Sequence, residues 1–158
     1  MPYGCHVTCL HRVGATQEER EEYLRFAPWK IGEREGETTL TPERFAELQE
    51  KEQFILTVTV NGYGKRSSAY EYRRIGRGGQ GIVNIDTSER NGAVVASFPA
   101  RNGEQIMLVT DQAKMIRTMV GDIRIMGRNT QGVTLFDVAE GETVVSAARI
   151  DEEEEPEN

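Results

Sequence analysis

From Gln53 to Ile150 the chain is a series of short runs in which apolar and polar residues alternate, separated by turn sequences. Such alternation indicates β-strands, because successive side chains of a strand point to opposite faces of a sheet. Dipeptides such as Asn61-Gly62 are typical of the tight turns between strands. The pattern predicts strands at 53–60, 68–75, 80–86 and 92–98, and again at 105–110, 115–119, 131–138 and 143–149.

Two helices are predicted ahead of the strands. Thr16 and Glu19 have the spacing of a capping box, in which each side chain covers a free amide at a helix start. This helix is expected to run through Leu24 and to end before Pro28. A second helix is expected to begin at Pro42, because proline is favoured at the first helical position. The charged stretch between the helices lacks periodicity and is interpreted as a loop.

The strand region contains an internal repeat. The frame acid-x-Arg-x-x-Gly-Arg-x-x-Gln-Gly begins at Glu71 and again at Asp122, 51 residues later. The match extends to both sides with displacements of 50 to 52 residues, and residues 52–56 correspond to 104–108. A period near 50 built of short strands is typical of propeller blades. The predicted fold class is all-β: an incomplete β-propeller of two four-stranded blades and part of a third, with a short helical insertion near the N-terminus and a disordered acidic tail.

The expected domain boundaries follow from this repeat. Residues 1–12 are interpreted as the end of a preceding blade, 13–52 as a helical inter-blade insertion, 53–103 and 104–150 as blades, and 151–158 as an acidic disordered tail. Two repeats and part of a third are too few to close a ring, so blade edges are expected to stay open.

The distribution of charge changes what the net charge suggests. A net charge of −7 over 158 residues argues by itself against nucleic acid. Residues 1–59, however, carry seven Lys and Arg against eleven Asp and Glu, a net −4. Residues 60–128 carry eleven against six, a net +5, and residues 129–158 carry one against nine, a net −8. The centre of the repeats is therefore basic and the ends are acidic.

The basic region suggests a site for phosphate. Cations recur at equivalent places in the two repeats, as Arg66 and Arg117 do, and glycines near them bring backbone amides close to a ligand. Stacked blades would place these cations on one rim, where they would contact phosphates without reading base sequence. The alternative is a solvated charged face without a ligand. The candidate DNA-binding residues are Lys65, Arg66, Arg73, Arg74, Arg77, Gly78, Gly79, Lys114, Arg117, Arg124 and Arg128.

Other kinds of site are disfavoured by spacing. The glycine-rich loop at 76–81 continues as a strand pattern, whereas a nucleotide-binding loop needs a following helix, so ATP binding is not expected. Cys5, His6, Cys9 and His11 lack the separated pairs that wrap a tetrahedral zinc ion. The two cysteines are interpreted as free thiols of a cytosolic protein. No run approaches the ~20 apolar residues of a membrane span.

Four segments of the repeats resemble one known family. They are EQFILTVTVNGYGKRSSAYEYR at 52–73, GRGGQGIVNI at 76–85, QIMLVTDQAKMIR at 105–117 and GRNTQGVTLF at 127–136. They are similar to the C-terminal, DNA-wrapping domain of the A subunit of bacterial DNA gyrase, and they occur in the family's order. The resemblance extends from about Leu10 to the acidic tail. It implies the last blades of that domain, with the helical segment as the family's variable inter-blade insertion.

The resemblance implies DNA binding and wrapping in an ATP-dependent type II topoisomerase that introduces negative supercoils. The implied partners are double-stranded DNA, the gyrase B subunit, and the rest of the gyrase A subunit, without a membrane, in the cytoplasm at the nucleoid. ATP and Mg²⁺ are used by other domains of the family's complex, so no cofactor is expected on this chain. The module with the nucleophilic tyrosine has no counterpart, so no catalytic residue is expected among Tyr3, Tyr23, Tyr63, Tyr70 and Tyr72.

The chain departs from the family in its glycine-arginine box. The family's box is Gln-Arg-Arg-Gly-Gly-Lys-Gly, and residues 75–81 keep four of these seven positions, with Ile75, Gly76 and Gln80 as the departures. This form resembles the counterpart in a later blade. Two questions stay open: whether the chain is instead a propeller-type protein-interaction fragment without DNA binding, and whether the acidic tail only confers solubility or competes with DNA for the basic rim.

Overall fold

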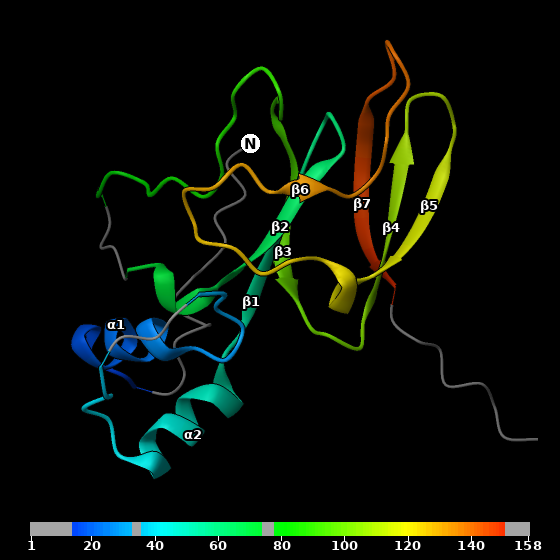
Figure 1. Cartoon of the computed structure of the whole chain (residues 1–158). Coiled ribbons are helices and arrows are strands. Elements are labelled where there is room, and N and C mark those ends of the chain that lie inside the picture. Colours follow the sequence, from blue (N-terminus) through cyan, green and yellow to red (C-terminus); the bar gives the residue numbers. More distant parts are fainter. Residues whose placement is uncertain (1–13, 33–35, 74–77, 151–158) are drawn as a thin grey trace, which may run out of the picture.

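The computed structural model describes residues 14–32, 36–73 and 78–150. Two helices at one end of the molecule precede two antiparallel β-sheets, which stand next to each other (Figure 1). The predicted all-β class with a short helical insertion is confirmed, whereas the strand composition of the blades differs from the prediction.

Helix α1 (Gln17–Phe26) begins with the predicted capping box. The Glu19 amide donates to the Thr16 hydroxyl at 3.2 Å, and the Thr16 amide donates to the Glu19 carboxylate at 2.9 Å. The helix runs two residues further than predicted and ends where the backbone of Ala27 becomes extended, just ahead of Pro28. The predicted first helix is confirmed.

Helix α2 (Pro42–Lys51) begins at the predicted proline, with the Thr41 hydroxyl accepting from the Arg44 amide at 3.2 Å. Arg44 also joins the helices, because its guanidinium donates to both carboxylate oxygens of Glu19 at 2.8 and 3.0 Å. These bonds lower the pKa of Glu19 to about 2. The two helices and their flanking residues, 14–32 and 36–52, therefore form one unit, the helical module.

The first sheet contains β1 (Phe54–Thr59), β2 (Tyr63–Ser68), β3 (Val94–Ala100) and β6 (Val133–Thr134), in the order β3-β1-β2-β6. The second sheet contains β4 (Gln105–Thr110), β5 (Met115–Met119) and β7 (Val144–Ile150), in the order β5-β4-β7. Short 3-10 helices, η2 (Ala69–Glu71) and η3 (Val120–Asp122), follow β2 and β5.

The two sheets repeat each other in register. Phe54 pairs with Ser68 between β1 and β2, and Gln105 pairs with Met119 between β4 and β5. The β1–β3 and β4–β7 pairs also agree, down to a register shift just before the last pair of each. Equivalent residues are 51 apart in the first two strands and 50 apart in the third. The predicted repeat is confirmed, with one correction: residues 52–56 correspond to 103–107, not to 104–108.

This displacement decides how the sheets pack. Leu56 and Val58 of β1 lie in one buried cluster with Ile106 and Leu108 of β4. Leu56 is equivalent to Met107, whose side chain points away from Ile106 and Leu108, because neighbouring residues of a strand face opposite ways. The sheets therefore meet through opposite faces, as stacked propeller blades do.

Three strand predictions need correction. The strand expected at 68–75 lies at 63–68 instead and is followed by η2. No strand forms at 80–86. The strand expected at 131–138 shortens to β6, which pairs with β2 of the first repeat rather than with a strand of its own repeat. Each repeat supplies three strands of its own sheet, and the fourth strand of the first sheet comes from the second repeat.

Glycines allow this exchange. A Cβ on Gly64 would lie 2.5 Å from the Thr57 carbonyl oxygen and 2.5 Å from the Leu135 side chain. A Cβ on Gly132 would lie 2.6 Å from the Gly64 carbonyl oxygen. The backbones of the two repeats approach this closely because neither position carries a side chain.

The helical module packs on the first repeat. The Tyr23 ring meets the Tyr70 ring edge-on with centroids 5.5 Å apart, and the Tyr70 hydroxyl donates to the Leu48 carbonyl at 2.8 Å. Glu52 accepts hydrogen bonds from the Tyr23 hydroxyl and, at 2.9 Å, from the Trp29 indole. Burial raises the pKa of Glu52, although both donors favour the charged form. Apolar contact and buried hydrogen bonds together fix the module to the sheet.

Glu142 joins two turns of the second sheet. Its carboxylate accepts from the Thr110 hydroxyl at 2.6 Å, from the Ala139 amide at 2.9 Å and from the Lys114 ammonium at 2.9 Å. Only 3% of the residue is exposed. These donors, the Thr110 hydroxyl foremost, lower the pKa of Glu142 to about 2.

We expect Glu142 to make the fold sensitive to acid. Its pKa is lower in the folded state, so its contribution to stability is full above the ordinary value of 4.5 and disappears as the pH falls toward about 2. Glu142→Gln should flatten this part of the stability curve without abolishing it, because Glu19 titrates in the same window. The check is the urea midpoint of unfolding, measured from neutral to acid pH. Glu140→Gln, at an exposed neighbour, should keep the wild-type curve. Superimposable curves for wild type and Glu142→Gln would contradict this role.

Candidate nucleic-acid interface

Lys65 projects from β2 onto the backbone of the second repeat. Its ammonium group donates to the carbonyl oxygens of Gly127 at 2.8 Å, of Arg128, and of Thr130 at 3.1 Å. The side chain is fully buried, and burial lowers its pKa to about 8. Lys65 therefore fixes the path of the loop at 127–130.

Arg66 fixes the segment just before that loop. Its Nε donates to the Ile123 carbonyl at 2.6 Å and its Nη2 to the Gly121 carbonyl at 3.2 Å. Its backbone amide donates to the Arg124 carbonyl at 3.0 Å, and its carbonyl accepts from the Met126 amide at 2.8 Å. The chain from η3 to the loop is thereby bound along β2.

The structure corrects the prediction that Lys65 and Arg66 contact DNA. Their exposed fractions are 0% and 5%, and their donors are occupied by backbone carbonyls and, for Arg66, also by the Asn102 side-chain oxygen, so a phosphate does not reach them. The physical reason is that β2 is an inner strand between β1 and β6. One sequence signal pointed this way: the equivalent of Lys65 in the second repeat is the apolar Ile116.

Lys114 and Arg117 are exposed; Lys114 lies just before β5 and Arg117 in the middle of it. The Lys114 ammonium pairs with Glu142 at 2.9 Å, and the Arg117 Nε donates to the Gln105 side-chain oxygen. Arg117 is equivalent to Arg66, so this position is exposed in one sheet and buried in the other. Arg66 and Arg117 therefore do not lie on one common exposed rim. A role of Lys114 and Arg117 in DNA binding stays a prediction.

The glycine-rich loop is described only in part. Arg74 and Arg77 lie outside the described residues. Gly78 and Gly79 are exposed, and nothing lies within 4 Å of where a Cβ would stand on Gly78. Their role in DNA binding stays a prediction.

Arg73, Arg124 and Arg128 come together in the fold. Arg73 and Arg128 line a cavity of about 750 Å³ between α1 and the 127–130 loop, and Arg124 lines a neighbouring cavity of about 540 Å³. The two cavities share lining residues, Leu24 and Glu71 among them, so they adjoin each other; together they are called the interface groove. It is lined by two acids, Glu21 and Glu71, and by six cations: Arg20, Arg25, Lys30, Arg73, Arg124 and Arg128.

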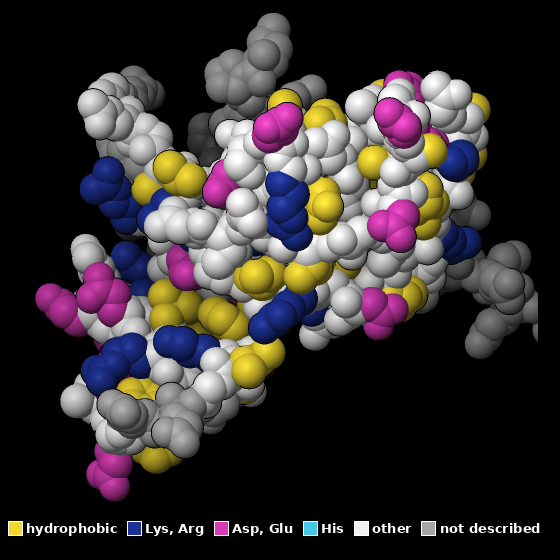
Figure 2. Space-filling view, turned by 45° about the horizontal axis from the view of Figure 1, so that its top comes forward, with side chains coloured by type: hydrophobic (Ala, Val, Ile, Leu, Met, Phe, Trp, Pro, Cys, Tyr) yellow, Lys and Arg dark blue, Asp and Glu magenta, His cyan; other side chains and the backbone are white. Residues whose placement is uncertain are grey.

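The groove combines free cations with an apolar floor. Arg73 and Arg124 are exposed, and neither side chain makes a hydrogen bond or ion pair with another described residue. Trp29, Ile125 and Met126 are among the apolar residues that line it. Figure 2 shows hydrophobic side chains in the hollow between the helices and the sheets, with Lys and Arg side chains on both sides of it. Uncommitted cations beside an apolar floor suit a polyanion such as nucleic acid.

Half of these cations come from the helical module and were not predicted. Arg25 and Lys30 are exposed. Arg20 is buried and donates to the Ala15 carbonyl at 2.7 Å, while its Nε has no partner among the described residues. The sequence held no signal for them, because the module has no counterpart in the repeat.

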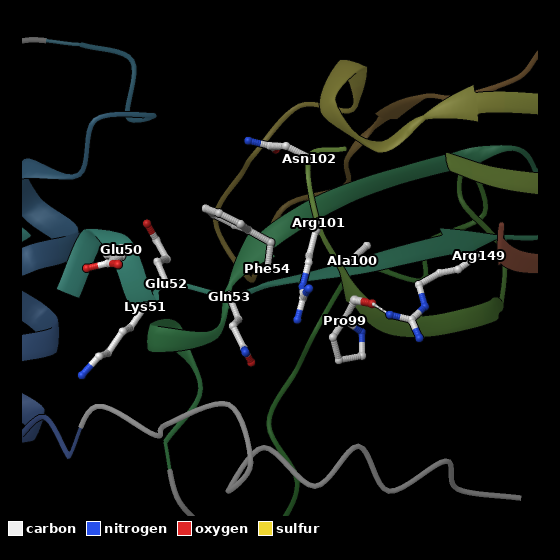
Figure 3. Close-up of a pocket in the computed structure, with 10 residues that line it drawn as sticks. All are labelled: Glu50, Lys51, Glu52, Gln53, Phe54, Pro99, Ala100, Arg101, Asn102 and Arg149. Carbon is white, nitrogen blue, oxygen red and sulfur yellow. Dashed lines mark hydrogen bonds between the residues drawn. The ribbon is translucent and has the colours of Figure 1, made fainter. Parts of the chain in front are cut away.

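A second cleft, of about 690 Å³, lies where the two sheets and α2 meet (Figure 3). Its cations are Lys51, Arg101 and Arg149, and its acids are Glu50 and Glu52. Arg149 donates a hydrogen bond to the Pro99 carbonyl at 3.4 Å, and Lys51 forms an ion pair with Glu47 at 2.8 Å. With its charges nearly balanced, this cleft offers an anion less than the interface groove does.

Within the part of the chain that the structure describes, no three His, Cys, Asp or Glu side chains are placed to hold a metal ion. Cys5, His6, Cys9 and His11 lie outside it, as does the acidic tail. In the same part, no helix has both the length and the apolar character needed to cross a membrane.

Comparison with known proteins identifies the family. The family model described as "DNA gyrase C-terminal domain, beta-propeller" matches residues 53–101 and 104–151. The chain belongs to the DNA gyrase A C-terminal domain family. A solved structure of the DNA gyrase A C-terminal domain is similar, with a TM-score of 0.60 at 24% identity, over 65% of this chain and 35% of that one. A solved structure of the C-terminal domain of DNA topoisomerase IV has a TM-score of 0.57 at 23% identity, over 63% of this chain and 30% of that one. At this identity they show the fold alone.

Curated relatives, each the A subunit of a bacterial DNA gyrase, are several times longer than this chain. The one from Granulibacter bethesdensis is 48% identical and covers 89% of this chain, and the one from Rickettsia felis is 43% identical and covers 96%. The chain spans 17% and 18% of their lengths. The relative from Pseudomonas aeruginosa is 46% identical but matches 98 residues, 62% of this chain. Helices α1 and α2 lie outside the family model.

We expect Lys65→Met to destabilise the fold by about 2 to 3 kcal/mol, because it leaves buried carbonyl oxygens without a donor. Urea unfolding checks this, with Lys51→Met at an exposed position as the matched control. Duplex binding measured on the same samples tests whether Lys65 also contacts DNA. A Lys65→Met chain as stable as the wild type but unable to bind DNA would show that Lys65 contacts phosphate after all.

Proposed function

We propose that this chain binds double-stranded DNA through the interface groove and helps to wrap it, as part of the A subunit of a gyrase-class type II topoisomerase. One observation carries the proposal: Arg73, Arg124 and Arg128, supplied by both repeats, line a single groove in a chain of net charge −7. The similarity to the A subunits of bacterial DNA gyrases supports the assignment to that polypeptide.

The proposed contacts go to the sugar-phosphate backbone. Arginines that neutralise phosphates release condensed counterions, which supplies affinity without sequence preference. A duplex that follows the stacked blades has to bend, so the selectivity we propose comes from deformability and not from base edges. This fits Arg73 and Arg124, which are exposed and make no side-chain hydrogen bond or ion pair with another described residue. Arg128 is half-buried, and its guanidinium donates to the Val83 carbonyl.

The proposed share of this chain in the reaction is mechanical. It holds DNA in the wrap that gives strand passage its direction, whereas strand cleavage and the use of ATP and Mg²⁺ belong to the B subunit or to other parts of the A subunit. The chain itself binds no cofactor and acts in the bacterial cytoplasm, at the nucleoid.

The salt dependence of duplex binding tests the proposal. The three arginines should contribute about −2.7 to the log–log slope, which by itself is a loss of about 40-fold in affinity between about 50 and 200 mM salt. Replacing Arg73, Arg124 and Arg128 by Gln should make the slope shallower by about 2.7, because each lost contact removes about 0.9. Fluorescence anisotropy with a labelled mixed-sequence duplex measures both quantities.

The second cleft supplies the matched control. Replacing the cleft's three cations by Gln removes the same amount of charge outside the interface groove and should leave most of the slope in place. These cations are Lys51, Arg101 and Arg149. Equal losses in both triple variants would mean that net charge alone drives binding. No binding by the wild-type chain at low salt would favour the protein-interaction alternative.

A further inference from the structure

The interface groove has two banks. Arg73, Arg124 and Arg128 form the bank on the sheet side, and the helical module forms the other. Arg25 lies in the last turn of α1, with 64% of its side chain exposed and a single surface ion pair to Glu22 at 3.2 Å. Lys30 is exposed and makes no side-chain hydrogen bond or ion pair with another described residue. Exposed ion pairs contribute little, so both cations are available to a ligand.

The module holds its bank in a fixed position. Trp29, next to Lys30, donates its indole N–H to the half-buried Glu52 at 2.9 Å, and Tyr23 of α1 is fully buried against Tyr70. Arg44 ties the start of α1 to α2 through Glu19. Cations carried on a rigid support lose less conformational freedom on binding than cations on a free loop.

The charge across the groove is complementary to a polyanion. Six cations line it against Glu21 and Glu71. Glu71 is half-buried, and the charges of Lys65 and Arg128 oppose its own, while burial raises its pKa. The cations are spread over two adjoining cavities rather than gathered around one point. This arrangement suits successive phosphates of a nucleic-acid strand better than one small anion.

We propose that the helical module is the second bank of the DNA site, with Arg25 and Lys30 binding backbone phosphates across the interface groove from Arg124. This inference rests on the proposed function and adds to it a segment that the family's model does not include. The phosphates of one strand then lie between the sheets and the module.

The test is the salt dependence of duplex binding by the 158-residue chain with Arg25→Gln and Lys30→Gln combined. Loss of two phosphate contacts should make the log–log slope shallower by about 1.8, so that the fall in affinity between about 50 and 200 mM salt shrinks by about 12-fold. Arg25→Lys combined with Lys30→Arg keeps both charges and should keep the wild-type slope. Thermal unfolding of each variant shows that the fold is intact.

Lys51→Gln combined with Arg101→Gln is the matched control, because it removes two charges outside the groove. If this control lowers the slope as much as the Arg25 and Lys30 variant does, the inference is overturned in favour of a net-charge effect. It is also overturned if the Arg25 and Lys30 variant binds like the wild type while loss of Arg73, Arg124 and Arg128 weakens binding. In that last case the proposed function stands. If the wild-type chain does not bind DNA at all, both the proposed function and this inference are overturned.

Discussion

The structure depends on two cations buried on an inner strand. Lys65 and Arg66 on β2 donate to carbonyl oxygens of the second repeat, between Gly121 and Thr130. An ammonium or guanidinium taken out of water without partners is costly by several kcal/mol, so the chain around each cation has to keep its carbonyls in place. The segment at 121–130 therefore follows a fixed path along β2, and this path carries Arg124 and Arg128 to the interface groove. Lys65 and Arg66, which the sequence predicts as DNA contacts, instead position the residues that face the groove.

Strand exchange reinforces the same joint. β6 completes the sheet of the first repeat, and the close approach of Gly64 and Gly132 leaves no room for side chains between the repeats. By the repeat's register, the outer edge of β5 is the equivalent of the edge of β2 that β6 occupies. Met115 and Met119 on that strand are 66% and 39% exposed. The two repeats thus share a strand and are not independent blades.

The groove exists because the helical module is fixed to the same sheet. Tyr23, Trp29 and Tyr70 join the module to the first repeat through ring contacts and through hydrogen bonds to Glu52 and the Leu48 carbonyl. The opposite bank is held by Lys65 and Arg66. Both banks are therefore held in place by β1 and β2. The width of the groove is thus set by the packing of one sheet and not by flexible loops.

Features that depend on neighbours in sequence were determined by the sequence itself. The capping box at Thr16, the helix start at Pro42, the apolar run of β1 and the alternation in β4 and β5 are local, and the repeat of 51 residues followed from residue identity alone. The family was also recognisable, because its motifs are contiguous in the chain. The strand after Asn61-Gly62 was misplaced, because Lys65 and Arg66 break the apolar alternation there.

The fate of each cation was decided only by the tertiary structure. Arg66 and Arg117 are equivalent in sequence, yet one is enclosed by the carbonyls of the next repeat and the other is exposed on β5. Arg25 and Lys30 reach the groove only because the module folds back beside the 127–130 loop. The sequence shows a charged side chain in the same way whether it is exposed to water or enclosed by carbonyl oxygens. Which of the two surrounds it depends on chain segments some 60 residues away, which no local pattern encodes.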